Sequence, residues 1–375
     1  MKILLTGGHF SPAYTIIKEL TKRGNSVAIA GRKYTFEGEN IEAFEYEVSR
    51  KEDIPFFEIK TGRLQRKFTK YTIFSIFKII SGFYDSFKIL LKFKPDIVLT
   101  FGGYIGFPIA YASFMLGIPV VLHEQTQKAG LSGKAISWIA SRICISYESS
   151  QKYFNQRKTT FTGNPIRDEI FKTNKKIPVE KGYKIVYITG GSSGSHFLNQ
   201  LIPKILLKLL KDFTVILQSG DNVSFNDYEE LEKVKRDLPL ELKRRYILKK
   251  FVYPEEIGNI FEISDIVVSR AGINTVGELL ALGKVSLLIP LPHGQKGEQL
   301  ENANLIKDAG IGDFIEEKDA DPETVYLKIK EMIEKRSEYE KNKSRLQSLI
   351  PKDAAVKILN VIKEVYFEKI EQKKA

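Results

Sequence analysis

Residues 97–124 read IVLTFGGYIGFPIAYASFMLGIPVVLHE. The stretch carries no charge up to residue 122 and is long enough to suggest a membrane span. Glycine and proline interrupt it, however, at Gly102, Gly103, Pro108, Gly117 and Pro119. We therefore predict a buried strand at 97–100, a glycine loop, a short helix and a second buried strand from residue 120. This alternation predicts a parallel sheet.

The same alternation of strands and helices extends to both sides of this stretch. Further strands of the first half are expected at 3–6, 26–30 and 142–145. In the second half we expect strands at 184–189, 213–218, 265–269 and 286–289, helices at 195–210, 274–282 and 298–309, and an amphipathic helix at 354–370. The polar, lysine-rich residues 168–184 are predicted to be a linker. The fold class is therefore α/β, with two doubly wound sheets.

The composition is that of an ordinary globular protein except for its charge. Of 375 residues, 58 are Lys or Arg and 46 are Asp or Glu, which gives a formal charge of +12. The length suggests two domains, and the basic excess indicates nucleic acid, an anionic membrane or phosphorylated substrates as partners. A single cysteine, Cys144, excludes an internal disulfide framework. The apolar run at the N-terminus is too short for a signal peptide.

Two glycine turns follow predicted strands and are typical of phosphate-binding loops. Residues 6–9 (TGGH) lie between a strand and a helix, and residues 190–194 (GGSSG) repeat that arrangement in the second half. Glycine lets backbone N–H groups approach a phosphate, and a helix N-terminus favours negative charge. Neither turn has the dinucleotide-binding or Walker pattern. His9 is a candidate base or diphosphate donor, although it could simply cap the turn.

Polar residues also end a wholly apolar strand at 123–126 (HEQT). Four consecutive polar residues at that point have no obvious packing role, which favours a binding function. Glu124 is therefore a second candidate base.

The segment 269–278 (SRAGINTVGE) closes a strand of the second half and begins a helix. A carboxylate one turn into such a helix, here Glu278, can accept both hydroxyls of a ribose. The alternative is an acid that faces water near the start of the helix.

No metal site is predicted. Asp319 and Asp321 resemble a metal-binding pair, but no third ligand accompanies them. Asp321 followed by Pro322 is instead typical of a helix N-cap.

Residues 60–94 combine basic and aromatic side chains. Bases such as Lys70 and Lys78 alternate with aromatic residues such as Phe74 and Phe77. An apolar face surrounded by lysine is typical of proteins that bind an anionic membrane surface. The alternative is that the aromatic residues belong to the core of a long helix, but the excess of positive charge favours membrane contact.

Together these motifs resemble one family, the MurG family of peripheral-membrane glycosyltransferases (glycosyltransferase family 28). Its members add N-acetylglucosamine to lipid I and yield lipid II for peptidoglycan. The resemblance covers nearly the whole chain and is carried by residues 6–12, 102–108, 123–125, 129–131, 163–167, 190–199, 269–279 and 299–303. The most specific signatures are HEQ followed by AGL, and GNPIR at 163–167.

The resemblance implies the GT-B arrangement, in which two Rossmann-like domains face each other across a cleft. It implies a domain at 1–166 that binds the acceptor and the membrane, and a UDP-sugar-binding domain at 167–350. A C-terminal helix at 351–375 would return to the first domain.

The resemblance also assigns site residues by position. Val252 would contact uracil, Glu278 the ribose, and Ser192 with Arg167 the diphosphate. Sugar and phosphates would be contacted by Thr6, Gly7, Gly8, Thr126 and Gln299. The other implied donor- or substrate-binding residues are Gly103, Tyr104, Gln125, Asn164, Gly191, Gly194, Arg270, Ala271, Gly272 and Thr275.

The implied reaction is an inverting transfer that requires no cofactor or metal, with UDP-N-acetylglucosamine as co-substrate. His9 first, and Glu124 second, would take the proton of the acceptor hydroxyl. Implied partners are UDP-N-acetylglucosamine, undecaprenyl-linked lipid I, the anionic inner-membrane surface and other cell-wall synthesis proteins, without nucleic acid. The implied location is peripheral, at the cytoplasmic face of the bacterial cell membrane.

The chain departs from the family's pattern at three places. Leu4 and Leu5 stand where the first loop usually has glycines, Thr126 replaces an asparagine, and Glu298 precedes the distal glutamine. A diacylglycerol glycosyltransferase that uses a UDP-sugar shares this fold and membrane habit, and is the second enzyme hypothesis. A basic nucleic-acid-binding protein is the non-enzymatic hypothesis, but no nucleic-acid motif supports it.

Overall fold

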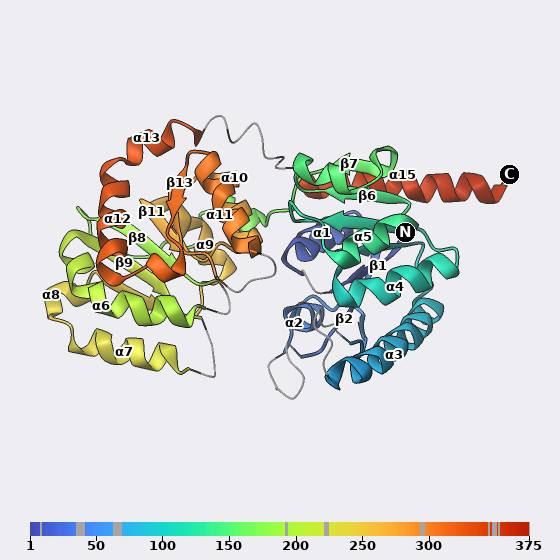
Figure 1. The fold of residues 1–375 in the computed structure, drawn as a ribbon, viewed down its shortest axis with the longest axis horizontal. Helices are drawn as coiled ribbons and strands as arrows, with labels where there is room; N and C mark the ends of the chain where they lie inside the picture. The colour runs from blue at the N-terminus through green and yellow to red at the C-terminus, as the bar shows by residue number, and fades with distance from the viewer. Residues whose placement is uncertain are drawn as a thin grey trace. The chain divides into compact units, whose positions relative to one another are not determined.

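The computed structural model of the chain describes residues 1–7, 10–34, 42–62, 70–191, 194–220, 225–292, 297–343, 346, 351 and 353–374. The chain divides into two compact units, each built on a parallel β-sheet (Figure 1). Unit 1 comprises Met1–Arg167 and Pro351–Ala375, and unit 2 comprises Asp168–Ile350.

The sheet of unit 1 has the strand order β3-β2-β1-β4-β5-β6-β7 in the described part of the chain. Its strands are β1 (Lys2–Thr6), β2 (Ser26–Gly31), β3 (Phe56–Glu58), β4 (Ile97–Thr100), β5 (Val120–Glu124), β6 (Arg142–Ile145) and β7 (Thr159–Phe161). Its helices are α1 (Phe10–Lys22), α2 (Phe44–Lys51), α3 (Lys70–Phe93), α4 (Gly103–Met115), α5 (Leu131–Ile139) and α15 (Ala354–Lys374), with short turns η1 (Glu148–Tyr153) and η2 (Gln156–Lys158).

Helices cover both faces of this sheet, which explains why β1, β4 and β5 are buried at nearly every position. On one face, Ile16 of α1 and Ile358 and Ile362 of α15 join the same buried cluster as strand residues of β1 and β4. Helices α3, α4 and α5 contribute to a second cluster on the opposite face. Helix α15 lies beside α1 and β6, so the end of the chain packs in the core of unit 1 (Figure 1).

The prediction for residues 97–124 is confirmed, since this stretch forms β4, α4 and β5. Pro108 lies inside α4 without ending it. Across the described residues, the structure contains no helix with the length and apolar character needed to cross a bilayer.

The sheet of unit 2 has the order β10-β9-β8-β11-β12-β13 among the described residues. Its strands are β8 (Lys184–Thr189), β9 (Phe213–Gln218), β10 (Tyr246–Lys249), β11 (Ile266–Ser269), β12 (Ser286–Leu288) and β13 (Gly312–Phe314). Its helices are α6 (His196–Asp212), α7 (Asp227–Asp237), α8 (Leu240–Lys243), α9 (Pro254–Ile263), α10 (Ile273–Leu282), α11 (Glu298–Asp308), α12 (Pro322–Glu334) and α13 (Arg336–Glu340), with turns η3 (Asp168–Phe171) and η5 (Glu317–Asp319).

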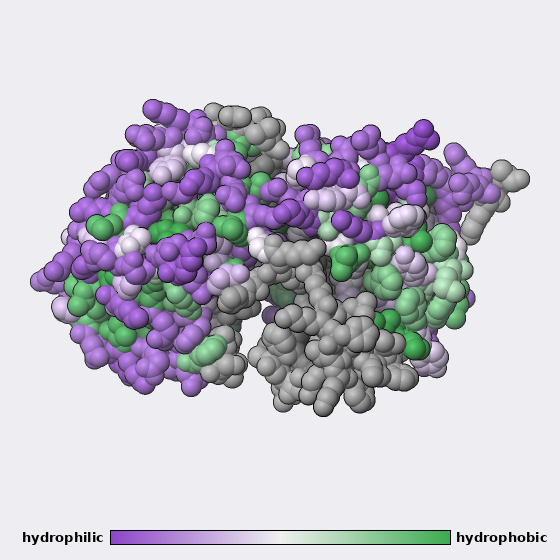
Figure 2. Space-filling view, in the orientation of Figure 1, coloured by the Kyte–Doolittle hydropathy of each residue, from purple (hydrophilic) through white to green (hydrophobic). Residues whose placement is uncertain are grey.

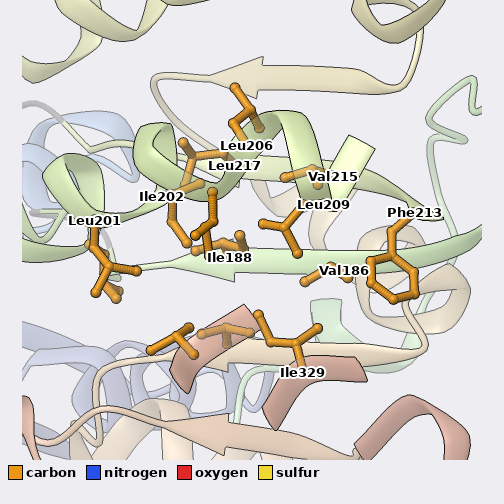
Figure 3. Packing of buried hydrophobic residues seen from close by; sticks show 14 of the residues in the cluster. Val186, Ile188, Leu201, Ile202, Leu206, Leu209, Phe213, Val215, Leu217 and Ile329 are labelled. Carbon is orange, nitrogen blue, oxygen red and sulfur yellow. The ribbon is translucent and has the colours of Figure 1, made fainter. Parts of the chain in front are cut away.

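The core of unit 2 lies between its sheet and the helices α6 and α12. Figure 3 shows side chains of α6 and Ile329 of α12 gathered around Val186 and Ile188 of β8. These residues are almost completely buried. On the other face, Tyr187 packs edge-on against Phe261 of α9, with ring centroids 5.9 Å apart.

The predicted linker at 168–184 is packed against unit 2 along its first half, so that prediction is wrong there. Ile177 N donates to Asn259 Oδ1 of α9 at 2.6 Å. Buried Glu256 of α9 pairs with Lys175 at 2.8 Å and with Lys249 at 2.9 Å. The chain therefore leaves unit 1 at Arg167 and joins unit 2 almost at once.

Candidate active site

The strand order of unit 1 reverses between β1 and β4, and hydroxyl groups join the ends of these strands. Thr6 Oγ1 lies 3.1 Å from Thr100 Oγ1, which accepts a hydrogen bond from Gly102 N at 3.2 Å. Both threonines are fully buried. Open α/β sheets bind ligands at such a reversal, outside the carboxyl ends of the strands. Because the Thr6 hydroxyl is buried, its contact with Thr100 links the ends of β1 and β4 beneath the loops of this edge.

Glycines let the two loops at this reversal approach neighbouring groups. A Cβ atom on Gly7 would lie 2.7 Å from Glu45 Oε1. Gly103 has a φ of +70° and its N donates to Ser132 Oγ at 2.9 Å. No heavy atom lies within 4 Å of a Cβ placed on Gly103, so its backbone borders open space in the described part of unit 1. Gly8 and His9 lie outside the described residues.

The carboxylate of Glu124, the second candidate base, is held from two sides. Its Oε1 accepts hydrogen bonds from Thr126 N at 3.2 Å and from Thr126 Oγ1 at 2.7 Å. Its Oε2 lies 2.6 Å from the place of a Cβ on Gly133, so the backbone of α5 approaches the carboxylate closely. Glu124 is 9% exposed. Thr126, which departs from the family's pattern, thus orients Glu124.

His123 has a structural role at the end of β5. Its Nε2 lies 3.2 Å from Gly163 O and 3.3 Å from Ser146 Oγ, and the side chain is fully buried. It therefore ties β5 to the segment 163–167. The interpretation that all four polar residues at 123–126 lack a packing role is wrong for His123.

Two buried amides at the same edge have side-chain atoms without hydrogen-bond partners among the described residues. They are Nε2 and Oε1 of Gln125, which is 2% exposed, and Oδ1 of Asn164, which is 8% exposed. A buried polar atom of this kind is normally satisfied by water or a ligand. Both amides therefore suit the substrate-binding role predicted for them. Arg167, predicted to lie near the diphosphate, is the last residue of the first segment of unit 1.

The strand order of unit 2 reverses between β8 and β11, and the loop after β8 depends on glycine. Gly191 has a φ of +81° and its N donates to Thr189 Oγ1 at 3.0 Å. Gly194 has a φ of +74°, and a Cβ there would lie 1.9 Å from Ser219 O. Glycine is thus required at position 194 for two reasons, the positive φ of its backbone and the close approach of Ser219 O after β9. Ser192 lies outside the described residues.

Arg270, at the end of β11, connects three loops of unit 2. Its Nε donates to Ser195 Oγ at 2.9 Å and its Nη1 to Ile289 O at 3.0 Å. It is ion-paired with Glu317 at 2.5 Å and lies over the ring of Phe197. Burial lowers the pKa of Arg270, and Glu317 opposes that shift. The guanidinium therefore links the loop after β11 to the loops after β8, β12 and β13.

The start of α10 lies beside this arginine. Asn302 Nδ2 of α11 donates to Ala271 O at 3.0 Å, which holds the two helices together. Gly272 is the N-cap of α10, and Thr275 is half-buried in its first turn. Glu278 is 8% exposed, so the alternative of an acid facing water is wrong. A buried carboxyl at this place suits the predicted ribose contact.

Three further predicted or noted residues of unit 2 are Val252, after β10, and Glu298 and Gln299, at the start of α11. Val252 is half-buried in the turn after β10. Gln299 Oε1 accepts a hydrogen bond from Leu291 N at 2.9 Å, so its carbonyl holds the loop before α11. Burial raises the pKa of Glu298, and nearby Glu301 adds to that rise.

In the described parts of both units, no three His, Cys, Asp or Glu side chains gather as a metal site. Asp321 caps α12, because its Oδ1 accepts hydrogen bonds from Glu323 N at 3.0 Å and Thr324 N at 3.1 Å. The predicted N-cap is confirmed.

Two charged residues at the reversal of unit 1 were not singled out from the sequence. Arg32 directly follows β2, and its guanidinium lies 4.5 Å from the centre of the Tyr104 ring. Glu45 of α2 is 8% exposed, and burial raises its pKa, whereas hydrogen bonds from backbone N–H groups and the charge of Arg32 lower it. For Arg32, the sequence did contain a signal: an arginine that directly follows Gly31, the last residue of an apolar strand.

Helices α3, α4 and α5 expose large apolar side chains, part of which form the green area over α3 and α4 in Figure 2. This apolar surface comprises Ile80, Tyr84, Leu91, Phe114, Met115, Leu131 and Trp138. Trp138, the only tryptophan of the chain, is 83% exposed. Lys78 and Lys88 are exposed on α3, and the side chains of Lys70, Phe74 and Phe77 lie outside the described residues.

Comparisons with known proteins identify the family. The glycosyltransferase family 28 N-terminal domain matches residues 6–145, and the C-terminal domain of that family matches residues 185–358. The chain is 32% identical over 349 residues to the UDP-N-acetylglucosamine--N-acetylmuramyl-(pentapeptide) pyrophosphoryl-undecaprenol N-acetylglucosamine transferase of Clostridium perfringens strain SM101, covering 90% of this chain and 92% of that protein. It is 34% identical over 342 residues to the Clostridium botulinum strain Alaska E43 protein of that name, covering 88% and 89%.

Solved structures show the same fold. The crystal structure of Acinetobacter baumannii MurG matches with a TM-score of 0.71 and 22% identity, covering 97% of this chain and all of that one. A UDP-GlcNAc 2-epimerase from Neisseria meningitidis, solved bound to UDP-GlcNAc, matches with a TM-score of 0.63 and 16% identity over 97% of this chain and all of its own. Because an epimerase shares the fold, the fold alone does not select the reaction. The sequence relatives do: the chain belongs to the MurG family of glycosyltransferase family 28.

Proposed function

We propose that this protein transfers N-acetylglucosamine from UDP-N-acetylglucosamine to lipid I, which gives lipid II for peptidoglycan. The observation that carries the proposal is the match to transferases of that name over nine-tenths of the chain. The matched region includes the strand-order reversals of both units, where α/β sheets bind ligands.

The donor is assigned to unit 2. The backbone of the loop after β8, with its glycines at Gly191 and Gly194, leads into the N-terminus of α6, an arrangement that suits a diphosphate. Buried Glu278 is assigned to the ribose and Val252 to the uracil. Gln299 and Thr275 remain candidates for the sugar and phosphates.

The acceptor is assigned to unit 1, and the reaction is a single displacement. A base removes the proton of the acceptor hydroxyl, whose oxygen forms a bond to the anomeric carbon as the bond to the UDP oxygen breaks. The configuration at that carbon inverts. His9 is assigned first to this role, and Glu124, whose carboxylate is oriented by two hydrogen bonds from Thr126, is assigned second. Backbone N–H groups, and Arg167 from unit 1, are assigned to the charge on the leaving diphosphate.

Contact with the membrane is assigned to the apolar surface of α3, α4 and α5. Lys78 and Lys88 are exposed on α3, and the ammonium of Lys88 lies 4.4 Å from the centre of the Tyr84 ring. Such a combination of apolar and basic side chains favours an anionic bilayer. The proposed location is the cytoplasmic face of the bacterial cell membrane. Trp138 provides a direct test, because transfer of an exposed indole into the bilayer interface shifts its fluorescence to shorter wavelength. Anionic vesicles should shift it, and duplex DNA should not.

The experiment that tests the function is a transfer assay with radiolabelled UDP-N-acetylglucosamine and a lipid I analogue. We expect label in a lipid II analogue, at the same rate with or without a chelator. UDP-glucose should compete poorly, and diacylglycerol should accept no label. Transfer to diacylglycerol, or conversion of the donor to its 2-epimer without an acceptor, would contradict the proposal.

A further inference from the structure

Arg32 occupies a particular place at the carboxyl edge of the sheet in unit 1. Its Nη2 donates to Thr61 O at 3.3 Å, and its guanidinium lies 4.5 Å from the centre of the Tyr104 ring. Thr61 follows β3, and Tyr104 is in the first turn of α4 after β4. In the order β3-β2-β1-β4, these two contacts lie on opposite sides of the end of β1. The guanidinium is therefore held near the carboxyl end of β1.

The charge of Arg32 is available at this edge. In the described part of the chain, no ion pair joins Arg32 to a carboxylate, and one hydrogen bond uses one of its five N–H donors. The buried carboxyl that acts on it is Glu45, whose pKa is raised by burial. Arg270 of unit 2 differs, because Glu317 pairs with it.

The loop that precedes Tyr104 leaves space beside its backbone. Gly102 and Gly103 both have positive φ, and the space where their side chains would stand is open or only loosely filled. The Tyr104 ring covers one side of the guanidinium. A planar guanidinium with several free donors binds a phosphate through two parallel hydrogen bonds, which a lysine cannot do.

We propose that Arg32 binds the diphosphate of the lipid-linked acceptor. The inference rests on the proposed function, since that reaction supplies an acceptor whose sugar is attached through a diphosphate. Tyr104 and Thr61 act as positioning residues for the guanidinium. Arg32 thus gives the acceptor side a cationic contact of its own.

The first test measures binding of inorganic pyrophosphate by calorimetry with UDP present at saturation, so that the donor site is filled. Arg32→Gln should weaken binding by about 10-fold or more, the range expected for loss of charged hydrogen bonds. The matched control is Lys33→Gln, which removes one charge from the next residue, whose ammonium lies over Tyr34 and Tyr46. That control should bind within about 2-fold of wild type.

Three outcomes of this test would overturn the assignment. In the first, the wild type binds no pyrophosphate when UDP is present. In the second, the wild type and Arg32→Gln bind it equally well. In the third, Arg32→Gln and Lys33→Gln lose the same amount of affinity. Binding that appears only without UDP would assign the anion to the donor's phosphates instead. None of these readouts needs catalysis, so they decide about Arg32 even if no transfer to lipid I is found.

The second test separates the two substrates kinetically. Arg32→Gln should raise the KM of the lipid I analogue by about 10-fold and leave the KM of UDP-N-acetylglucosamine within about 2-fold. Arg32→Lys should recover part of the loss, because it restores the charge without the planar fork. The midpoint of thermal unfolding should stay within 2 °C or so of wild type. An unchanged acceptor KM would contradict the proposal.

Discussion

Both sheets reverse their strand order once, yet the two reversals use arginine in different ways. In unit 2, Arg270 is bonded to Ser195 and Ile289 and paired with Glu317. In unit 1, the guanidinium of Arg32 makes one hydrogen bond and one ring contact among the described residues. In unit 2 the arginine stabilises the edge of the sheet, whereas in unit 1 we assign the arginine to ligand binding. Glycine-rich sequence at a strand end does not distinguish these two cases.

The largest effect is expected from removing the internal arginine of unit 2. Arg270→Met leaves Glu317, Ser195 Oγ and Ile289 O without their partner in a half-buried setting. The free energy of unfolding should fall by about 3 kcal/mol, measured by urea denaturation. Arg244→Met, at an exposed arginine of the same unit, should change it by less than about 0.5 kcal/mol. Equal losses would remove the special role of Arg270.

The glycine loop of unit 2 offers an internal comparison. Gly191 and Gly194 both have positive φ, but only a Cβ on Gly194 would meet Ser219 O. Gly191→Ala should therefore cost about 1 kcal/mol of stability. Gly194→Ala should in addition displace the loop and weaken UDP binding by about 10-fold or more. Calorimetric titration with UDP measures the difference, and equal UDP affinities for the two variants would contradict it.

A smaller effect is expected at the end of β5 in unit 1. Thr126→Val removes the 2.7 Å hydrogen bond that orients the Glu124 carboxylate. We expect kcat to fall by about 5- to 10-fold, with the KM of the donor nearly unchanged. Thr126→Ser keeps the hydroxyl and should stay within about 2-fold of wild type. If the valine variant matched the serine variant, Thr126 would not position Glu124.

The smallest effect is expected from Glu45, where the sign depends on pH. Because burial raises the pKa of this carboxyl in the folded state, ionisation opposes folding above its folded pKa. Glu45→Gln should therefore raise the free energy of unfolding at pH 8, by about 1 kcal/mol at most. The gain should vanish as the pH falls below the unfolded pKa. Glu47→Gln, an exposed residue of the same helix, should show no such trend.

Much of the fold could be predicted from the sequence, because apolar runs with polar ends mark buried parallel strands. The strands β4, β6 and β9 have the bounds that were expected. The three-residue strands β3, β7 and β13 were missed, since so short a segment carries no periodic signal. Helices α7 and α9 were missed as well.

The site was predictable only in part. Glycine turns and polar strand ends located both reversals. The partners of Arg32 and Arg270 were not predictable, since they lie 29 and 19 or more residues away along the chain. His123 and Thr126 looked like ligand contacts because their partners, Gly163 and the neighbouring Glu124, become visible only in the fold.

The central claim is that unit 1 binds the acceptor and unit 2 binds the donor. A bisubstrate initial-rate experiment on Arg32→Gln and Gly194→Ala tests it most directly, with both substrates varied. We predict that Arg32→Gln raises the KM of the lipid I analogue alone and that Gly194→Ala raises the KM of UDP-N-acetylglucosamine alone. If both variants raised the KM of the same substrate, the division of the reaction between the two units would be wrong.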